Sequence, residues 1–574
     1  MSRPQDAIPK LSRGESVEVA QKDGESASGE ALPEGWADVE LGEVCKHITD
    51  GSHAPPKAQE SGLPMLGAKN VSNGGFSFEN PRWITPEAFE KEDRRTDVQP
   101  NDVLLITVGA TLGRSTVVPE GLPKFTLQRS VGVIKPIELD PHFVSFQLRS
   151  PEFQRYFERT AKGTAQKGIY LKTLSGTSIK VAPKAEQSRI VSAIESLQER
   201  SSRARVLLSE VGPLIGQLRQ SVLHDAFSGK LTADWRARRR MGTPESPSPP
   251  APSEENSGLG AQATNPAQET ASELLLRIRT ERRERWQSEQ LAKYEAKGKQ
   301  PPKNWQDKYK EPEPVDESEL PQLPDGWCWA NLEELAAYQK NAIKAGPFGS
   351  SLKKAFYVES GYKIYGQEQV INGDPYFGDY YIDQERFDLL KSCEVQPGDL
   401  LVSLVGTIGR TLVLPDDIEP GIINPRLIKI TLNPKIIHPP FLQYYFRAPS
   451  VLEIFSRISH GGTMEILNMG TLKKLAYPVA PLAEQIEVVS RIEEAIEGME
   501  SVSELQASME SSLTQLDQSI LSKAFRGELV PQDPRDEPAS ELLARIRTTR
   551  EKLEAEKKAK KKSKTRKKKT EAEA

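Results

Sequence analysis

The stretch VQPNDVLLITVGATLGR spans residues 98–114, and VQPGDLLVSLVGTIGR spans residues 395–410. Each carries an apolar run that begins after an Asp and ends at a Gly, which is the pattern of a short buried strand bounded by turns. The two stretches differ by one residue inserted before the final GR. A second copy of this length indicates that the surrounding fold is duplicated.

The duplication extends outward in both directions from this pair. In the first half, the order is LPEGW (32–36), GAKNVSNG (67–74), APKAEQ (182–187) and AFSGKL (226–231). In the second half, it is LPDGW (323–327), GQEQVING (366–373), APLAEQ (480–485) and AFRGEL (524–529). Because the matches are colinear, we interpret them as two copies of one unit.

A long helical pattern follows each EQ pair. Apolar residues recur with alternating spacing of four and three over more than four heptads, which favours a coiled-coil seam over an ordinary surface helix. The predicted seam residues are Ile190, Ile194, Leu197, Leu208, Val211, Ile215 and Leu218, then Val488, Ile492, Met499, Val502, Leu513, Leu516 and Ile520. We expect the two helices to pack on each other, with a break or kink of the first at Gly212 and Pro213.

These patterns predict an α+β fold: two duplicated, mixed α/β domains with short strands, separated by two long helices packed as an antiparallel coiled coil, with a pseudo-two-fold internal repeat. The mixed domains are placed at 32–183 and 321–481, and the helical regions at 184–240 and 482–531. The remaining segments are a disordered extension (1–31), a disordered linker (241–270), a charged helix and linker (271–320), a C-terminal helix (532–556) and a basic disordered tail (557–574).

A third repeated element lies outside the domains. ASELLLRIRTER (271–282) and ASELLARIRTTR (539–550) carry Leu and Ile on one helical face and charged residues on the other. We expect these helices to dock on a partner surface, and the alternative is a solvated helix that only spaces domains.

Composition bounds the class of protein. The chain has 574 residues, a net charge of −4 and three Cys. Ten positive charges lie between Lys557 and Lys569, so the rest of the chain is acidic and charge alone does not indicate nucleic-acid binding. The few, widely spaced Cys, the lack of a long apolar run and the polar start predict a cytoplasmic protein that does not enter a membrane.

Signatures of catalysis and metal binding are missing from the sequence. GATLGRS (109–115) has three residues between its glycines where a phosphate-binding loop needs four, and Arg114 stands in place of the required Lys. Cys45, His47 and His53 lack a second pair of ligands for zinc. We therefore predict no catalytic residue, no metal ligand and no cofactor bound by this chain.

The repeated order of LPxGW, a VQPxD…VG…GR block, a GT followed by leucines, an EQ pair that opens a long helix and an AFxGxL that closes it resembles the specificity subunit of type I restriction-modification systems. The resemblance implies a non-catalytic subunit of a complex that cleaves DNA and methylates adenine. Its two target-recognition domains would each read one half of an asymmetric site in double-stranded DNA. It further implies two methyltransferase (modification) subunits, which use AdoMet, and two restriction (motor and endonuclease) subunits, which use ATP and Mg.

Candidate DNA contacts are basic residues for phosphates and amides for base edges. In the first domain they are Lys57, Lys69, Asn70, Arg114, Gln128, Arg129, Gln166, Lys167 and Lys172, and in the second Gln367, Gln369, Arg410, Asn424, Arg426, Asn468, Lys473 and Lys474. Lys69 with Asn70, and Gln367 with Gln369, are the strongest candidates for base readers, because they vary within a turn that both halves keep. Arg114/Arg410 and Arg129/Arg426 suit phosphate contacts or structural hydrogen bonds.

Two other functions are compatible with the sequence. One is a methyltransferase or nuclease that carries its own recognition domains, although the chain has neither an NPPY-type motif nor a glycine motif for AdoMet. The other is a duplicated coiled-coil scaffold that does not bind DNA.

Overall fold

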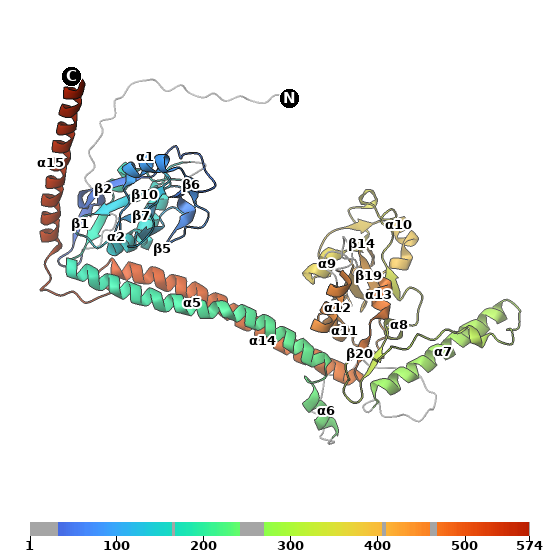
Figure 1. Cartoon of the computed structure of the whole chain (residues 1–574). Coiled ribbons are helices and arrows are strands. Elements are labelled where there is room, and N and C mark those ends of the chain that lie inside the picture. Colours follow the sequence, from blue (N-terminus) through green and yellow to red (C-terminus); the bar gives the residue numbers. More distant parts are fainter. Residues whose placement is uncertain (1–31, 164–166, 241–268, 405–408, 460–467, 573–574) are drawn as a thin grey trace, which may run out of the picture. The chain divides into compact units, whose positions relative to one another are not determined.

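The computed structural model describes residues 32–163, 167–240, 269–404, 409–459 and 468–572. It divides into two compact units, residues 1–208 with 507–574, and residues 209–506. Each unit contains one mixed domain and a segment of each long helix (Figure 1). The expected extension (1–31) and nearly all of the expected linker (241–270) lie outside the described residues.

The first domain is built on three small sheets and a hairpin. A four-stranded antiparallel sheet has the order β2-β10-β7-β8, a three-stranded sheet has the order β6-β3-β9, and β1 pairs with β11. The strands are β1 (Ala37–Glu40), β2 (Cys45–Asp50), β3 (Leu63–Leu66), β4 (Val71–Ser72), β5 (Gly75–Phe76), β6 (Arg82–Ile84), β7 (Val103–Ile106), β8 (Ser115–Val117), β9 (Thr126–Leu127), β10 (Val131–Pro136) and β11 (Ser178–Val181). The helices are α1 (Pro86–Thr96), α2 (Pro141–Leu148), α3 (Pro151–Thr160) and α4 (Leu171–Ser175), with the 3₁₀ turns η1 (Leu41–Val44) and η2 (Ala68–Asn70).

The second domain repeats this topology. Its sheets have the orders β13-β19-β16-β17, β15-β14-β18 and β12-β20, and in both three-stranded sheets one strand pair is parallel. The strands are β12 (Cys328–Ala330), β13 (Ile343–Ala345), β14 (Tyr362–Tyr365), β15 (Tyr381–Ile382), β16 (Leu400–Ser403), β17 (Thr411–Val413), β18 (Gly421–Ile423), β19 (Leu427–Ile430) and β20 (Tyr477–Val479). The helices are α8 (Leu332–Leu335), α9 (Gln367–Asn372), α10 (Gln384–Leu389), α11 (Pro439–Tyr445), α12 (Pro449–Ser459) and α13 (Met469–Lys474), with the 3₁₀ turns η4 (Lys354–Phe356) and η5 (Lys391–Cys393). The 3₁₀ turn η3 (Gln306–Lys308) precedes this domain.

The duplicated stretch that starts at Val98 forms the centre of each domain. In β7, Val103 and Leu105 pack into one hydrophobic cluster and Leu104 and Ile106 into another, so the sheet is buried on both faces. In the turn before the strand, Asn101 has φ 69° and the equivalent Gly398 has φ 77°, both in the left-handed region that Asn and Gly tolerate best. The motif therefore encodes a turn and a fully buried strand.

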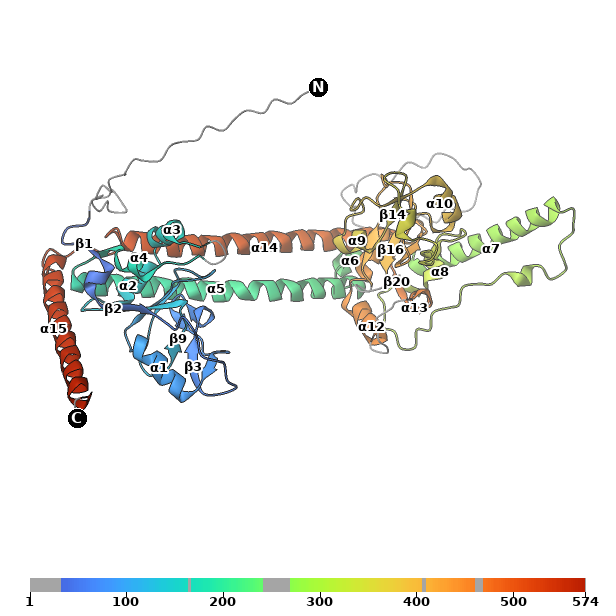
Figure 2. The same ribbon diagram turned by 90° about the horizontal axis from the view of Figure 1, so that it is seen from above.

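Two long helices, α5 (Lys184–Phe227) and α14 (Leu482–Ala524), each contribute to both units. In the first unit, Ile190 and Ile194 of α5 share a cluster with Ile520 and Leu521 of α14. In the second unit, the end of α5 and the start of α14 share another cluster. In each unit the two segments lie side by side with opposite chain directions (Figures 1 and 2).

The predicted seam is buried mainly near the helix ends. Ile190, Ile194, Val488, Ile492, Met499 and Ile520 are buried, Leu197, Leu208, Val211, Ile215 and Leu513 are intermediate, and Leu218, Val502 and Leu516 are exposed. Of the predicted break or kink at Gly212 and Pro213, the break is wrong, because α5 runs through both residues. Both are exposed, so water can replace the amide donor that proline lacks. The kink stays a prediction.

Hydrogen bonds between the LPxGW and EQ motifs join each domain to its long helix. The indole N–H of Trp36 donates to Glu186 Oε2 at 3.1 Å, and that of Trp327 donates to Glu484 Oε2 at 3.0 Å. The following Gln187 is buried, and its amide nitrogen donates to the carbonyl of Ala182. These contacts explain why both motifs occur in each half.

The ASELL helices dock on the chain's own domains, so the expectation that they dock on a partner is corrected. In α7 (Ala271–Ala296), the buried Leu274 and Ile278 join the core of the second domain. In α15 (Ala539–Ala572), the buried Leu542 and Ile546 join the core of the first domain. Their apolar faces pack into clusters within the same unit. Burying each large apolar side chain stabilises the folded domain by about 1.5–3 kcal/mol.

Two further helical segments complete the chain. After α5, α6 (Ala233–Arg240) is a separate short helix. The backbone of α15 is helical through Ala572, so it continues into the stretch that we expected to be a disordered tail. Lys, Ala and Glu are strong helix formers, and this composition explains the continuation.

Candidate nucleic-acid interface

Two of the strongest predicted base readers serve the structure of their loops instead. Asn70 is buried, its side-chain oxygen accepts from the amide of Gly67, and its nitrogen donates to the carbonyls of Ser77 and Glu79. The equivalent Gln369 is also buried and bridges the amide of Gly366 and the carbonyl of Phe377. Both amides are committed to the loop, so we withdraw Asn70 and Gln369 as base readers.

The residue before each of these amides is exposed. Lys69 on η2 and Glu368 on α9 occupy equivalent positions with opposite charges. Our sequence reasoning missed Glu368, although its alignment with Lys69 was a sufficient signal. A shared buried amide thus supports an exposed position that differs between the halves.

In the second domain, several predicted residues gather around α9. The Gln367 side chain donates to Ser403 Oγ at 2.9 Å and accepts from the Arg426 guanidinium at 3.3 Å. Arg410 donates to the carbonyl of Ile371 at 3.0 Å, and Asn424 Oδ1 accepts from the Arg426 amide. The structure therefore brings Gln367, Arg410, Asn424 and Arg426 together.

The first domain has a comparable arrangement around η2. A Cβ added to Gly67 would lie 2.9 Å from the Gln128 side chain, so that amide lies directly against the loop. Arg129 is exposed next to it, and its backbone amide donates to the carbonyl of Ser52. Arg114 and Lys57 are also exposed, on other loops of the domain.

The other predicted residues belong to different parts of the domains. Asn468 caps α13 through a hydrogen bond from the Thr471 amide, and Lys473 is paired with Glu333 at 2.5 Å. Lys474, Lys167 and Lys172 are exposed. Gln166 lies outside the described residues.

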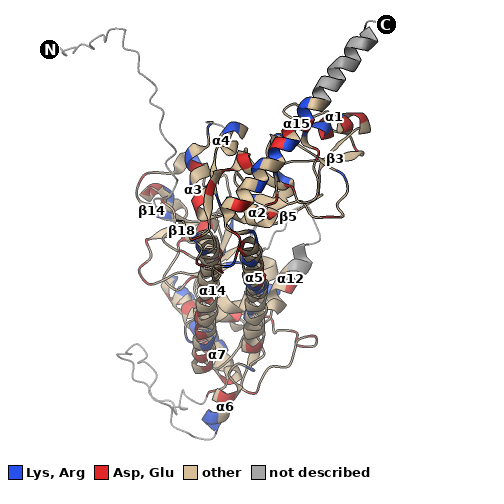
Figure 3. Cartoon of the chain, turned by 90° about the vertical axis from the view of Figure 1, so that its left-hand side faces the viewer, with Lys and Arg blue, Asp and Glu red and all other residues tan. Residues whose placement is uncertain are grey.

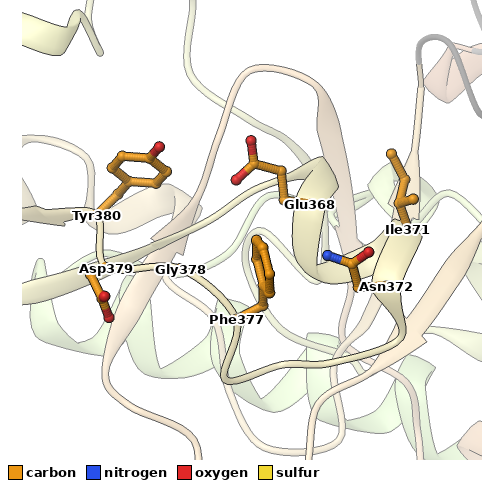
Figure 4. A pocket seen from close by; sticks show the side chains of 7 residues that line it. All are labelled: Glu368, Ile371, Asn372, Phe377, Gly378, Asp379 and Tyr380. Atoms are coloured by element: carbon orange, nitrogen blue, oxygen red, sulfur yellow. The ribbon is translucent and has the colours of Figure 1, made fainter. Parts of the chain in front are cut away.

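An open cavity of about 570 Å³ lies beside α9. Glu368 from α9 and the aromatic rings of Phe377 and Tyr380 from the following loop lie around it (Figure 4). Both rings are more than 40% exposed, at 43% and 49%. Aromatic faces next to a hydrogen-bond acceptor suit contact with nucleotide bases.

The described residues offer little reactive chemistry. Burial raises the pKa of Cys45 to about 12 and that of Cys328 to about 11, so both remain thiols at neutral pH. Within the described ranges, no three His, Cys, Asp or Glu side chains come together as metal ligands. Nor does any described helix have the length and apolar character needed to cross a membrane.

On α7 and α15, basic and acidic side chains lie close to one another along the helix. Along the described part of α15, basic and acidic residues alternate (Figure 3). Arg277 of α7 pairs with both Glu269 and Glu281. Basic character useful for phosphate binding must therefore come from particular clusters on the domains.

Comparisons with known proteins agree on one family. The family model for the type I restriction modification DNA specificity domain matches residues 33–205 and 326–510. The EcoBI specificity subunit of Escherichia coli is 31% identical over 211 residues, which are 36% of this chain and 44% of that subunit. The EcoDI specificity subunit of Escherichia coli is 22% identical over 90% of this chain and 96% of that subunit.

One solved structure shows the same overall fold as this chain. One chain, from a structure described as the basis of complex assembly and conformational transition of the type I R-M system, has a TM-score of 0.54 and 19% identity. The match covers 87% of this chain and all of that one. The HsdS subunit from Thermoanaerobacter tengcongensis has a TM-score of 0.47 at the same identity, over 87% of this chain and 99% of that one.

Proposed function

Since this chain belongs to the family of type I restriction-modification DNA specificity domains, we propose that each of its two mixed domains reads one half of a split DNA site. The proposal rests mainly on the Lys69/Glu368 position, where the buried amides of Asn70 and Gln369 support side chains of opposite charge in the two halves. A lysine suits the acceptor groups of guanine in the major groove, whereas a carboxylate suits the amino group of cytosine. The two half-sites would then differ in sequence.

We further propose that α5 and α14 act as a spacer between the two domains and as a platform for partner subunits. Leu214, Leu218, Val502 and Leu505, all in the second unit, are 47–60% exposed. These large apolar side chains support a role of the helices in protein contacts, which would remove them from water. The partners would be two modification and two restriction subunits, which would supply AdoMet chemistry and ATP- and Mg-dependent cleavage in the cytoplasm. This chain would supply recognition and assembly.

The proposal is tested by exchanging the charge at the variable position. We expect Lys69→Glu to change the preferred base at one position of the first half-site only, because each good base contact contributes about 1–3 kcal/mol of discrimination. Glu368→Lys should do the same in the second half-site. The measurement is sequencing of methylated adenines after reconstitution with the modification subunit.

Lys91→Glu is the matched control, since Lys91 is exposed on α1 of the first domain and carries the same charge. It should leave both half-sites unchanged. If Lys69→Glu and Glu368→Lys also leave both half-sites unchanged, these loops do not read bases. Methylation of DNA by the isolated chain with labelled methyl donor would instead favour a self-contained methyltransferase.

A further inference from the structure

A second cavity, of about 580 Å³, lies in the second unit between α5, the end of α9 and the α11–α12 region. Its lining includes three arginines from separate elements: Arg219 of α5, Arg410 before β17, and Arg447 between α11 and α12. All three are exposed enough to reach a ligand. The described residues that line it include neither Asp nor Glu.

The first unit provides an internal comparison for this cluster. Arg149 is the counterpart of Arg447, and each guanidinium lies over the ring of the residue three positions earlier, Phe146 at 5.2 Å and Tyr444 at 5.5 Å. The counterpart of Arg219, however, is Asp517. Asp517 pairs with Arg205 at 2.8 Å and lies close enough to Arg149 to favour its charged form.

The second unit therefore replaces the neutralising carboxylate with another cation. Desolvation lowers the pKa of Arg447, Tyr444 opposes this effect, and the charges of Arg219 and Arg410 lower the pKa further, so each of these two cations repels Arg447. The nearby Glu493 accepts a hydrogen bond from Tyr444 at 3.5 Å. An uncompensated cluster of this kind gains stability when an anion enters it.

We propose that Arg219, Arg410 and Arg447 form an anion site that holds a backbone phosphate of the bound DNA, and that the first unit lacks this site because Asp517 stands at the position of Arg219. The inference rests on the proposed function. Planar guanidinium groups match the paired oxygens of a phosphodiester. Arg410 also donates to the end of α9, the helix that begins with Gln367 and Glu368.

The position of α9 favours DNA over a carboxylate of a partner protein as the source of the anion. A helix of six residues is about 9 Å long, so a phosphate at one end and a base at the other belong to neighbouring parts of one strand. A phosphate contact positions the duplex without reading its sequence. The site would therefore position the DNA against the second domain, and the first domain would have no equivalent phosphate contact.

Arg219→Asp tests the proposal by placing in the cavity the carboxylate that Asp517 provides at the equivalent position of the first unit. The assay measures binding of a mixed-sequence duplex to the full chain reconstituted with its modification subunit, over a series of salt concentrations. We expect about tenfold weaker binding, and a slope of log Kobs against log salt that is shallower by about one, because one phosphate contact is lost. The methylated sequence should stay the same.

Arg200→Asp is the control, because Arg200 is exposed on the same helix, in the first unit and outside the cavity lining. If Arg219→Asp behaves like Arg200→Asp while the wild-type complex binds DNA normally, the inference alone is overturned. Loss of the modification subunit from Arg219→Asp with an unchanged salt slope would also overturn it, in favour of a protein carboxylate. A wild-type complex without salt-dependent DNA binding would overturn the proposed function as well.

Should Arg219→Asp unfold, Arg219→Gln and Arg447→Gln provide the same measurement without adding a charge. Each should make the slope shallower by about one, with an unchanged thermal midpoint. Wild-type slopes in both would contradict the proposal.

Discussion

Glu186 and Glu484 are equivalent residues in different electrostatic surroundings. Glu484 accepts hydrogen bonds from Thr232 and pairs with Arg236, besides holding Trp327. Glu186 holds Trp36, but its second carboxylate oxygen is buried without a hydrogen-bond partner among the described residues. Burial raises the pKa of Glu186, an effect that Trp36 and Arg189 oppose in part.

We expect Glu186→Gln to stabilise the first domain at pH 7 by roughly 1 kcal/mol, because an amide oxygen can still accept from Trp36 and no charge is buried. A raised folded-state pKa means that the wild type is most stable below the ordinary Glu pKa and loses stability as pH rises through the raised value. The variant should lack this loss. Urea unfolding with hydrogen exchange, repeated between pH 4 and 7, measures it.

Glu484→Gln is the matched variant in the second domain and should have the opposite sign. Removing its charge leaves Arg236 without an ionic partner in a mostly buried site, which costs about 2–4 kcal/mol. Equal effects of the two substitutions would contradict this explanation.

At the scale of elements, α7 and α15 act as caps on the two domain cores. Each begins with a backbone hydrogen bond to the glycine of an LPxGW motif: Ala271 donates to Gly326 at 2.9 Å and Ala539 donates to Gly35 at 2.8 Å. The first turn of α7 also has a capping box between Thr270 and Glu273. The repeat therefore includes these helices as structural parts of the domains.

Leu542→Ala should destabilise the first domain by about 2–4 kcal/mol, and Leu274→Ala the second by a similar amount, since both side chains are buried in a core. Leu276→Ala is the control, because Leu276 is 63% exposed on the same helix as Leu274 and should change stability by less than about 0.5 kcal/mol. Hydrogen exchange resolved by domain distinguishes the sites. Equal, small effects at all three positions would show that the helices do not cap the cores.

Local patterns predicted the elements well, but not the roles of polar side chains. The continuous apolar run VLLI, bounded by turn residues, indicated a buried strand, and the long four-three spacing indicated long helices. Asn70 looked like a base reader since its hydrogen-bond partners, Ser77 and Glu79, are fixed only by the folded loop. The cluster of Arg219, Arg410 and Arg447 likewise depends on segments far apart in sequence.

At the scale of the whole molecule, the spacer proposal makes a length prediction. Deleting seven residues from the middle of each long helix, 204–210 and 505–511, removes about 10 Å of helix while nearly preserving the apolar face. The gap between half-sites should shorten by about three base pairs, with both half-site sequences unchanged. Methylome sequencing measures the gap, and an unchanged gap would exclude a helical ruler.

The first unit is built from two separate segments of the chain, and this affects how the protein folds during synthesis. That unit joins residues up to Leu208 with residues from Ala507 onward, whereas the second unit is continuous from Ser209 to Gln506. On the ribosome, the second domain can close while the first still lacks Phe525, Leu542 and Ile546, which complete its clusters. At about 5–20 residues per second, the wait lasts on the order of 15–60 s. The domain made first is therefore finished last, and during that interval its open core is the surface that chaperones must protect.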